Sequence, residues 1–193
     1  LFIFMAQILD RSKVSEALFD VLYIVLGGLR GGLGMAVIVV STVFAATTGI
    51  VGASVVAMGL MAGPALLRRN YDKSLSAGII CSSGTLGILI PPSIMLVVYG
   101  GLTGMKETSV GNLFDGAILP GLLLSGMYLL YVAVRCFFKP ELGPPIPKEE
   151  RTHSLGQKVS MTMKSFVPPF GLILTVMGTI LAGVATPTEA AAL

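Results

Sequence analysis

The sequence contains no tryptophan, only two cysteines and a single histidine, and only 12% of its 193 residues are charged. Soluble domains carry about 25% charged residues, so a chain with a mean hydropathy of +0.88 is predicted to be an integral membrane protein. Cys81 and Cys136 lie in apolar runs without metal or redox spacing, so they are interpreted as small buried hydrophobic side chains. His153 lies among charges and is interpreted as solvated.

These shortages also exclude classes of function. One histidine, no paired carboxylates within an apolar run and no Cys/His ligand spacing leave no residue set for catalysis, so an enzyme is not expected. The net charge of +3 is small and comes from a few clusters, which gives no support to nucleic-acid binding. Because the chain opens on Leu1 and stops at Leu193 just after a new helix is expected to start, it is interpreted as an internal fragment of a longer protein.

Residues 1–30 are predicted to hold the end of a membrane helix, over 1–9, and then an amphipathic helix. Apolar residues recur there at helical spacing, but Glu16 and Asp20 interrupt the apolar face. Too few uncharged residues follow Asp20 to span a bilayer, so this helix is expected to lie at the membrane interface. The glycine-rich segment 27–34 is interpreted as a flexible joint.

Residues 31–73 are predicted to form a re-entrant helical hairpin. Glycines and hydroxyls at Thr47–Gly52 interrupt the uncharged run over 31–67. The arms that remain have about 15 residues each, whereas a crossing helix needs about 20. A hairpin that enters and leaves on one side is therefore favoured. Two short tilted helices that cross the membrane remain the alternative.

Residues 74–138 are predicted to hold a broken membrane helix and then an uninterrupted one. Proline lacks the amide that a helix needs and disfavours helical geometry in the preceding residue. The Pro91-Pro92 pair is therefore expected to unwind the first helix near 87–93, with a simply bent helix as the alternative. A polar loop is expected over 105–113 and the second helix over 116–134.

Residues 139–164 are rich in proline and charge and are predicted to form a cytoplasmic connector. Residues 165–193 are expected to add a membrane helix and the start of another structural unit, which Thr186-Pro187-Thr188-Glu189 would open with a capping box. In this arrangement the basic residues of 30–73 and 135–164 fall on one side of the membrane. The positive-inside rule makes that side the cytoplasm.

The two helix breaks carry the chemical information. Backbone groups without helical partners are tolerated at membrane depth only where they are buried in protein or line a cavity, and transporters use them to hold ions and solutes. Candidate residues for binding substrate and ion lie at the hairpin tip and around the second break: Thr47, Thr48, Gly49, Gly52, Ser54, Gly84, Thr85, Gly87, Pro91, Pro92 and Ser93.

Hydroxyl and carbonyl oxygens at such breaks suit a hard cation, and a helix N-terminus favours an anionic solute. A hard cation such as Na⁺ is therefore expected at Thr48, Gly49, Ser54 and Thr85, with no other cofactor. Ser82 and Ser83 are further hydroxyls beside the second break. The competing interpretation is structural, since Ser and Thr in membrane helices often bond a carbonyl of their own or a neighbouring helix.

Several segments in this order resemble the large membrane subunit of TRAP (tripartite ATP-independent periplasmic) transporters. The most specific is Gly84-Thr85-Leu86-Gly87-Ile88-Leu89-Ile90-Pro91-Pro92-Ser93. The others are Gly52–Pro64, Asn70-Tyr71-Asp72, Tyr99-Gly100, Ser109–Phe114, Pro120-Gly121-Leu122 and Thr186–Ala191. The resemblance covers essentially the whole chain.

The resemblance implies an all-α, multi-pass transporter of a bacterial or archaeal cytoplasmic membrane, built from two inverted repeats. Each repeat would contain a re-entrant hairpin and a broken helix, and this chain would hold the first repeat and the start of the second. The resemblance also implies an elevator-type Na⁺ symporter for organic anions such as C4-dicarboxylates. Its expected partners are a small membrane subunit, a periplasmic solute-binding protein and membrane lipid.

Two positions depart from the family pattern. Many members carry Ser-Gly-Ser-Ser at the hairpin tip, which falls on Thr48-Gly49-Ile50-Val51 here. Any ion contact at positions 50 and 51 would therefore use the backbone. The usual Gly-Tyr after the hairpin is Asn70-Tyr71, a mild change because asparagine also tolerates left-handed geometry.

Two functional hypotheses follow from the sequence. The first is Na⁺-coupled secondary transport of a carboxylate, with the tip and break residues forming the site. The second is a non-transporting membrane scaffold or assembly subunit in which the breaks serve packing only. Replacing Pro91 and Pro92 by alanine separates them, because only the first hypothesis predicts intact expression with transport lost.

Overall fold

The computed structural model describes residues 14–103, 109–145, 155–184 and 189, and within them the protein is helical without strands. The elements are α2 (Val14–Leu26), α3 (Gly32–Thr48), α4 (Val51–Arg68), α5 (Lys73–Gly84), the 3₁₀ turn η1 (Thr85–Ile88), α6 (Ile94–Thr103), α7 (Val110–Phe138), the 3₁₀ turn η3 (Pro140–Leu142) and α8 (Leu155–Leu181). The expectations for the helix end over 1–9 and for His153 concern segments outside the described residues. So does the capping box, of which only Glu189 is described.

Helices α3 and α4 form an antiparallel hairpin that reverses at Gly49, whose φ is +62°. Helix α3 has 17 residues and α4 has 18, so the arms are longer than the expected 15. Helix α3 continues to Thr48 and α4 begins at Val51, so the break is shorter than the expected Thr47–Gly52. Helix α4 is thus long and apolar enough to cross a membrane, and arm length alone does not distinguish re-entry from crossing.

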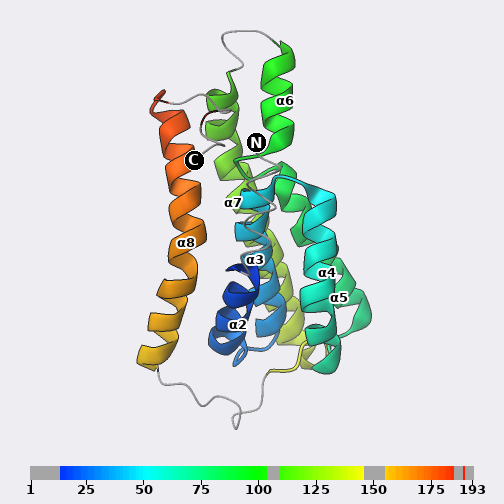
Figure 1. The fold of residues 1–193 in the computed structure, drawn as a ribbon. Helices are drawn as coiled ribbons and strands as arrows, with labels where there is room; N and C mark the ends of the chain where they lie inside the picture. Colours follow the sequence, from blue (N-terminus) through cyan, green and yellow to red (C-terminus); the bar gives the residue numbers. More distant parts are fainter. Residues whose placement is uncertain (1–13, 104–108, 146–154, 185–188, 190–193) are drawn as a thin grey trace.

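The next segment is broken as predicted from its proline pair. Helix α5 tightens into η1, and no helical residue lies between Leu89 and Ser93 before α6 begins. The Leu89 and Ile90 amides both donate to the Leu86 carbonyl, and Pro91-Pro92 is a cis peptide. Helices α5 and α6 therefore stack end to end with an irregular joint between them (Figure 1).

Helices α7 and α8 begin earlier than expected. The predicted polar loop over 105–113 was wrong from Val110 onward, because Ser109 caps α7: its hydroxyl accepts the Asn112 amide hydrogen at 3.2 Å. Helix α8 begins at Leu155, whereas the connector was expected to continue to 164. Polar residues at these helix starts resembled loop sequence, but polar side chains are common in first helical turns.

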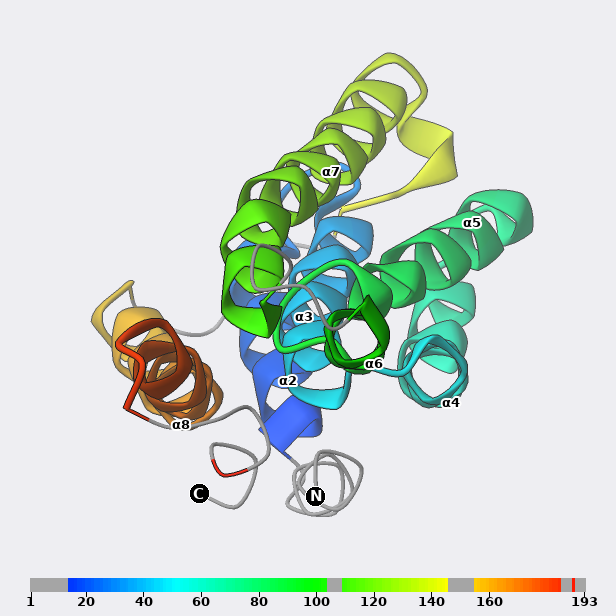
Figure 2. The same ribbon diagram turned by 90° about the horizontal axis from the view of Figure 1, so that it is seen from above.

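Helix α3 is the centre of the bundle and contacts α2, α4, α5, α7 and α8. Viewed along the bundle, α8 lies on one side of α3 while α4 and α5 lie on the other (Figure 2). The α3 side chains at Ala36, Val37, Ile38 and Val40 are fully buried. Besides α4, the described residues contain two further helical stretches able to span a membrane, within α7 and α8.

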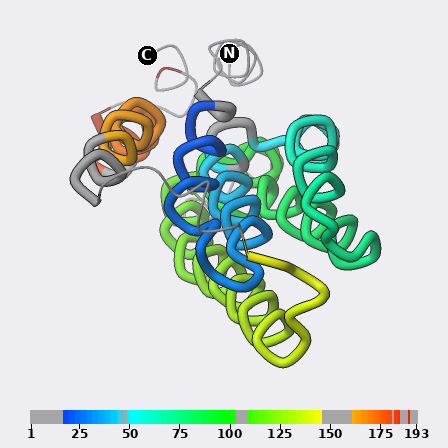
Figure 3. Tube along the Cα trace, turned by 90° about the horizontal axis from the view of Figure 1, so that it is seen from below, coloured from blue at the N-terminus to red at the C-terminus, as the bar shows by residue number. Residues whose placement is uncertain are grey.

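One end of the bundle is held together by backbone hydrogen bonds. The loop after α7 passes beneath the hairpin (Figure 3), where the Gly143 carbonyl accepts the Gly31 amide and the Leu142 carbonyl accepts the Asp72 amide. This base also carries Arg30, Arg68, Arg69, Lys73, Arg135 and Lys139. These six of the basic residues that the sequence assigned to one side of the membrane therefore lie at the same end of the bundle.

Candidate functional site: the junction of two helix breaks

The hairpin tip lies against the joint between α5 and α6. A Cβ atom added to Gly49 would lie 3.0 Å from the Ile94 amide nitrogen and 3.1 Å from the Pro92 carbonyl oxygen. A Cβ added to Gly87 would lie 3.6 Å from both the Ile50 nitrogen and the Ser54 Oγ. Two breaks separated by about forty residues of sequence thus form one backbone-lined junction. Glycine at position 49 permits the close approach, whereas a Cβ at position 87 would make only ordinary van der Waals contacts.

Four helix ends surround this junction. Helices α4 and α6 both begin there, so two sets of first-turn amides point toward it, and Ile50 gives α4 no side-chain cap. Helix α3 and the turn η1 both end there and contribute carbonyl groups. Helix N-termini attract anions and C-termini attract cations. The helix ends at the junction are therefore electrostatically suited to an anionic group on the amide side and to a cation on the carbonyl side.

The described hydroxyls at the junction bond to backbone carbonyls. Ser54 Oγ donates to the Ile50 carbonyl at 2.9 Å, Thr85 Oγ1 to Ser82 at 2.6 Å, and Ser93 Oγ to Ile88 at 2.8 Å. Each hydroxyl oxygen retains lone pairs after its hydrogen is donated. Ser54 and Ser93 are also fully buried, so their oxygens remain chemically suited to a cation.

Other sequence candidates have different positions. Gly84 packs against Val55: an added Cβ would overlap Val55 Cγ2 and lie 3.1 Å from the Val55 nitrogen. Gly52 is exposed with open space around an added Cβ. Pro91 and Pro92 are buried in the joint. Thr47 and Thr48 are the last residues of α3, and their side chains lie outside the described set.

Two hydroxyl contacts join α3 to its neighbours. Ser83 Oγ lies within hydrogen-bond distance of both Ser41 Oγ, at 3.0 Å, and the Ile79 carbonyl oxygen, so Ser83 links α5 to α3. Thr42 Oγ1 and Ser125 Oγ lie 2.7 Å apart and link α3 to α7. No local pattern in the sequence indicates these pairs, because their members are separated by 42 and by 83 positions in the chain and meet only in the folded bundle.

Among the described residues, no group of three His, Cys, Asp or Glu side chains could hold a metal ion. A cation at the junction would thus depend on neutral oxygens. Neutral carbonyl and hydroxyl oxygens suit a hard, weakly held ion better than a transition metal.

An all-helical membrane bundle in which two broken segments meet has the architecture of a membrane transporter. The whole chain, residues 1–193, matches the family model described as "Tripartite ATP-independent periplasmic transporter, DctM component". The chain belongs to this family, the large multi-pass inner-membrane permeases of TRAP transporters.

Three relatives indicate the breadth of the family. The chain is 38% identical over 193 residues to the C4-dicarboxylate TRAP transporter large permease protein DctM of Pseudomonas aeruginosa, covering 99% of the chain and 42% of that protein. It is 36% identical to the protein of the same description from Vibrio cholerae, covering 99% and 40%. It is 32% identical to the ectoine TRAP transporter large permease protein TeaC of Halomonas elongata, covering 100% and 43%. The chain thus spans less than half the length of these relatives.

Proposed function

We propose that this chain forms one half of the translocation site of a secondary transporter that takes up a small organic anion together with Na⁺. The observation that carries the proposal is the contact between Gly49 and the segment Pro92–Ile94. Two irregular backbone segments converge there at the middle of an apolar bundle. Such backbone is tolerated at membrane depth where it is buried or lines a solute cavity.

The expected substrate is a carboxylate-bearing solute. The amide ends of α4 and α6 converge on the junction, and helix N-termini favour negative charge. The relatives are named for C4-dicarboxylates and for ectoine, which is consistent with a family that varies its solute on a common scaffold. We assign the C4-dicarboxylate class to this chain because the two more similar relatives carry that name.

Na⁺ would lie on the carbonyl side of the junction, near the end of α3. We place it at Thr48, Gly49 and Ser54, with Thr85 further along the second break. Ser54 is the best-positioned hydroxyl, because it is buried and faces Gly87. Thr85 is exposed and bonds to its own helix, so its contribution is expected to be the smallest.

The transport cycle we propose is an elevator movement, with the hairpin and the broken helix moving together as one body. Their contacts support this: α4 packs on both α5 and η1, and α3 packs on α5 and η1. The short segment between α2 and α3 would be the joint. A small membrane subunit and a periplasmic solute-binding protein complete the assembly implied by the word tripartite.

Uptake measurements on the full-length protein with its partner subunits test this function. Radiolabelled C4-dicarboxylate should accumulate in proteoliposomes with an inward Na⁺ gradient and the binding protein present. Replacing Na⁺ by choline should abolish accumulation. Unchanged uptake in choline would overturn the coupling, and no uptake of any organic anion under either condition would overturn transport itself.

The scaffold alternative also has an observation in its favour. All three described hydroxyls at the junction donate to carbonyls of their own segment, a purely structural pattern. Replacing Pro91 and Pro92 by alanine separates the alternatives. Normal membrane expression with uptake lost supports transport through the break, whereas unchanged uptake supports packing alone.

A further inference from the structure

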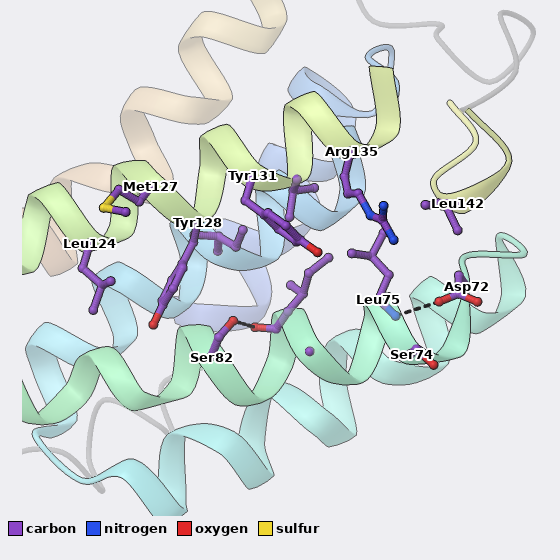
Figure 4. A pocket seen from close by; sticks show the side chains of 14 residues that line it. Asp72, Ser74, Leu75, Ser82, Leu124, Met127, Tyr128, Tyr131, Arg135 and Leu142 are labelled. Carbon is purple, nitrogen blue, oxygen red and sulfur yellow. Dashed lines mark hydrogen bonds between the residues drawn. The ribbon is translucent and has the colours of Figure 1, made fainter. Parts of the chain in front are cut away.

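A groove lies between α5 and α7, away from the junction of the breaks, and encloses a cavity of about 530 Å³. Its apolar lining includes Ile38 of α3, Leu75 and Ile79 of α5 and Leu124 of α7. Figure 4 shows the side chains of α7 reaching across toward α5. Met127 and Tyr131 are each more than half exposed, at 57% and 59%, so the groove is open along its side.

A positive charge lies at one end of this groove. Arg135 of α7 points toward the start of α5 (Figure 4), and it forms no ion pair within the described part of the chain. The Asp72 carboxylate nearby already accepts the Leu75 amide hydrogen at 2.8 Å as the cap of α5. Lys73 and Lys139 are exposed at the same end, together with Glu141. Basic residues thus outnumber acidic ones at the groove's entrance.

The depth of the groove matches one leaflet of a bilayer. Between Arg135 and Leu124 it follows three turns of α7, which is roughly 16 Å at 1.5 Å per residue. Half of a hydrocarbon core about 30 Å thick is about 15 Å. An apolar groove of this length, open sideways and basic at its aqueous end, has the polarity of a phospholipid molecule.

We propose that the α5–α7 groove binds an anionic phospholipid of the cytoplasmic leaflet, with the phosphate at Arg135 and an acyl chain along Leu75, Ile79 and Leu124. Guanidinium groups bind phosphate oxygens through paired charge-assisted hydrogen bonds. Basic pockets between membrane helices on the cytoplasmic side are suited to lipid head groups. The lipid would fill the space between two helices that contact each other only sparingly.

The competing occupant is another protein helix. Ser74, Gly78 and Ser82 line the α5 wall at intervals of four residues, and small residues at that spacing allow helices to approach closely. An added Cβ at Gly78 would meet nothing within 4 Å. The same space admits a lipid chain, and the two occupants differ in what can be crosslinked to position 78.

Photocrosslinking of the full-length protein with its partner subunits tests the proposal. The protein is reconstituted with phosphatidylglycerol that carries a diazirine at mid-chain, irradiated and digested, and the labelled peptides are identified by mass spectrometry. Label is expected on the peptides of α5 and α7 that line the groove. Arg135→Gln removes the charge and is expected to reduce that label about fivefold, since one basic residue near the membrane surface contributes about 1 kcal/mol. Gly78→Leu fills the groove and is expected to reduce the label because the side chain takes the space of the acyl chain.

Matched controls exist for both variants. Gly126→Leu places the same bulk on α7, where an added Cβ also meets nothing within 4 Å. Lys164→Gln removes an exposed charge from α8. Neither residue lines the groove, so both variants should label like the unmodified protein. Equal labelling in Gly78→Leu and Gly126→Leu, or a Gly78→Cys thiol that crosslinks to another protein segment while lipid label is absent, would overturn the lipid proposal. These outcomes do not depend on transport.

Discussion

Gly49 is the residue at which the hairpin reverses, and its φ of +62° lies in the left-handed region. Left-handed geometry costs a residue with a Cβ about 1–2 kcal/mol. Here the added methyl would also press on backbone atoms of Pro92 and Ile94, which cannot move as a flexible side chain can. Gly49 therefore joins two requirements, a turn and a close approach, at a single position.

We predict that Gly49→Ala lowers the free energy of unfolding by at least about 1–2 kcal/mol and reduces uptake more than it reduces expression. The reason is that the methyl group separates the hairpin tip from the start of α6. Thermal unfolding of the full-length protein in detergent and uptake in proteoliposomes measure the two effects. Gly59→Ala is the control, because its Cβ would meet only Ile80 Cγ2, at 4.0 Å. Equal behaviour of the two variants would contradict the prediction.

Tyr71 joins the two ends of the hairpin at the base of the bundle. Its side chain is buried, and its hydroxyl oxygen accepts the Leu33 amide hydrogen at 3.2 Å in the first turn of α3. The cap therefore comes from a residue 38 positions away. Burial raises the pKa of the Tyr71 phenol to about 12, while backbone hydrogen bonds from Gly34 and Leu33 lower it.

Removing this hydroxyl should destabilise the fold and remove a pH dependence. Tyr71→Phe is expected to cost about 1 kcal/mol, as for loss of a helix cap. Because the folded-state pKa of about 12 lies above the ordinary value of 10, the stability from the neutral phenol is complete below pH 10 and is lost as the pH rises through 12. Unfolding at graded urea concentrations measures the free energy of unfolding of the unmodified protein and of Tyr71→Phe. The difference between the two should shrink as the pH rises from 10 to 12. A constant difference up to pH 12 would contradict the assignment.

Between elements, the contact of α4 with α5 depends on one small residue. Gly84 faces Val55, and an added Cβ would lie 3.1 Å from the Val55 nitrogen and Cα. The backbone of α4 thus closes over a position where α5 has no side chain. Gly84 was a candidate binding residue from the sequence, whereas its geometry gives it a packing role.

We predict that Gly84→Ala destabilises the protein by about 1–3 kcal/mol, the usual effect of overpacking. Val55→Ala in the same background should recover part of this loss, because the overlap with Val55 Cγ2 is removed. A double-mutant cycle from thermal unfolding measures the coupling between the two sites. Strict additivity of the single effects would show that the two residues act independently.

For the helices and their breaks, the sequence predicted correctly the features that depend on neighbouring residues. The Pro91-Pro92 pair predicted the unwound joint, and Asn70 adopts a φ of 56°, as expected for its tolerance of left-handed geometry. The starts of α7 and α8 were missed because polar first turns resemble loops. The meeting of Gly49 with Pro92 and the α5–α7 groove depend on long-range packing, which a single sequence does not encode in any local pattern.

In the whole molecule, the basic residues and both ends of the hairpin lie at the same end of the bundle. Both ends of the hairpin lie at the base that carries Arg68 and Lys139, while α6 extends beyond the tip and packs against the first turns of α7 (Figure 1). The ten residues of α6 correspond to roughly 15 Å of helix. The tip therefore ends well short of the level reached by the start of α7.

This geometry predicts a labelling pattern for single cysteines in a cysteine-free background of the full-length protein. Arg68→Cys and Lys139→Cys should react with a bulky, impermeant maleimide only from the cytoplasmic side, because the positive-inside rule assigns the basic end of the bundle to the cytoplasm. Ser109→Cys, at the cap of α7, should react only from the periplasm. The informative position is Ala53, exposed in the first turn of α4. A re-entrant tip keeps Ala53→Cys from the periplasmic reagent, whereas a hairpin that crosses the membrane brings this residue to the periplasmic surface. Labelling of Ala53→Cys as fast as that of Ser109→Cys would therefore show that α3 and α4 are crossing helices.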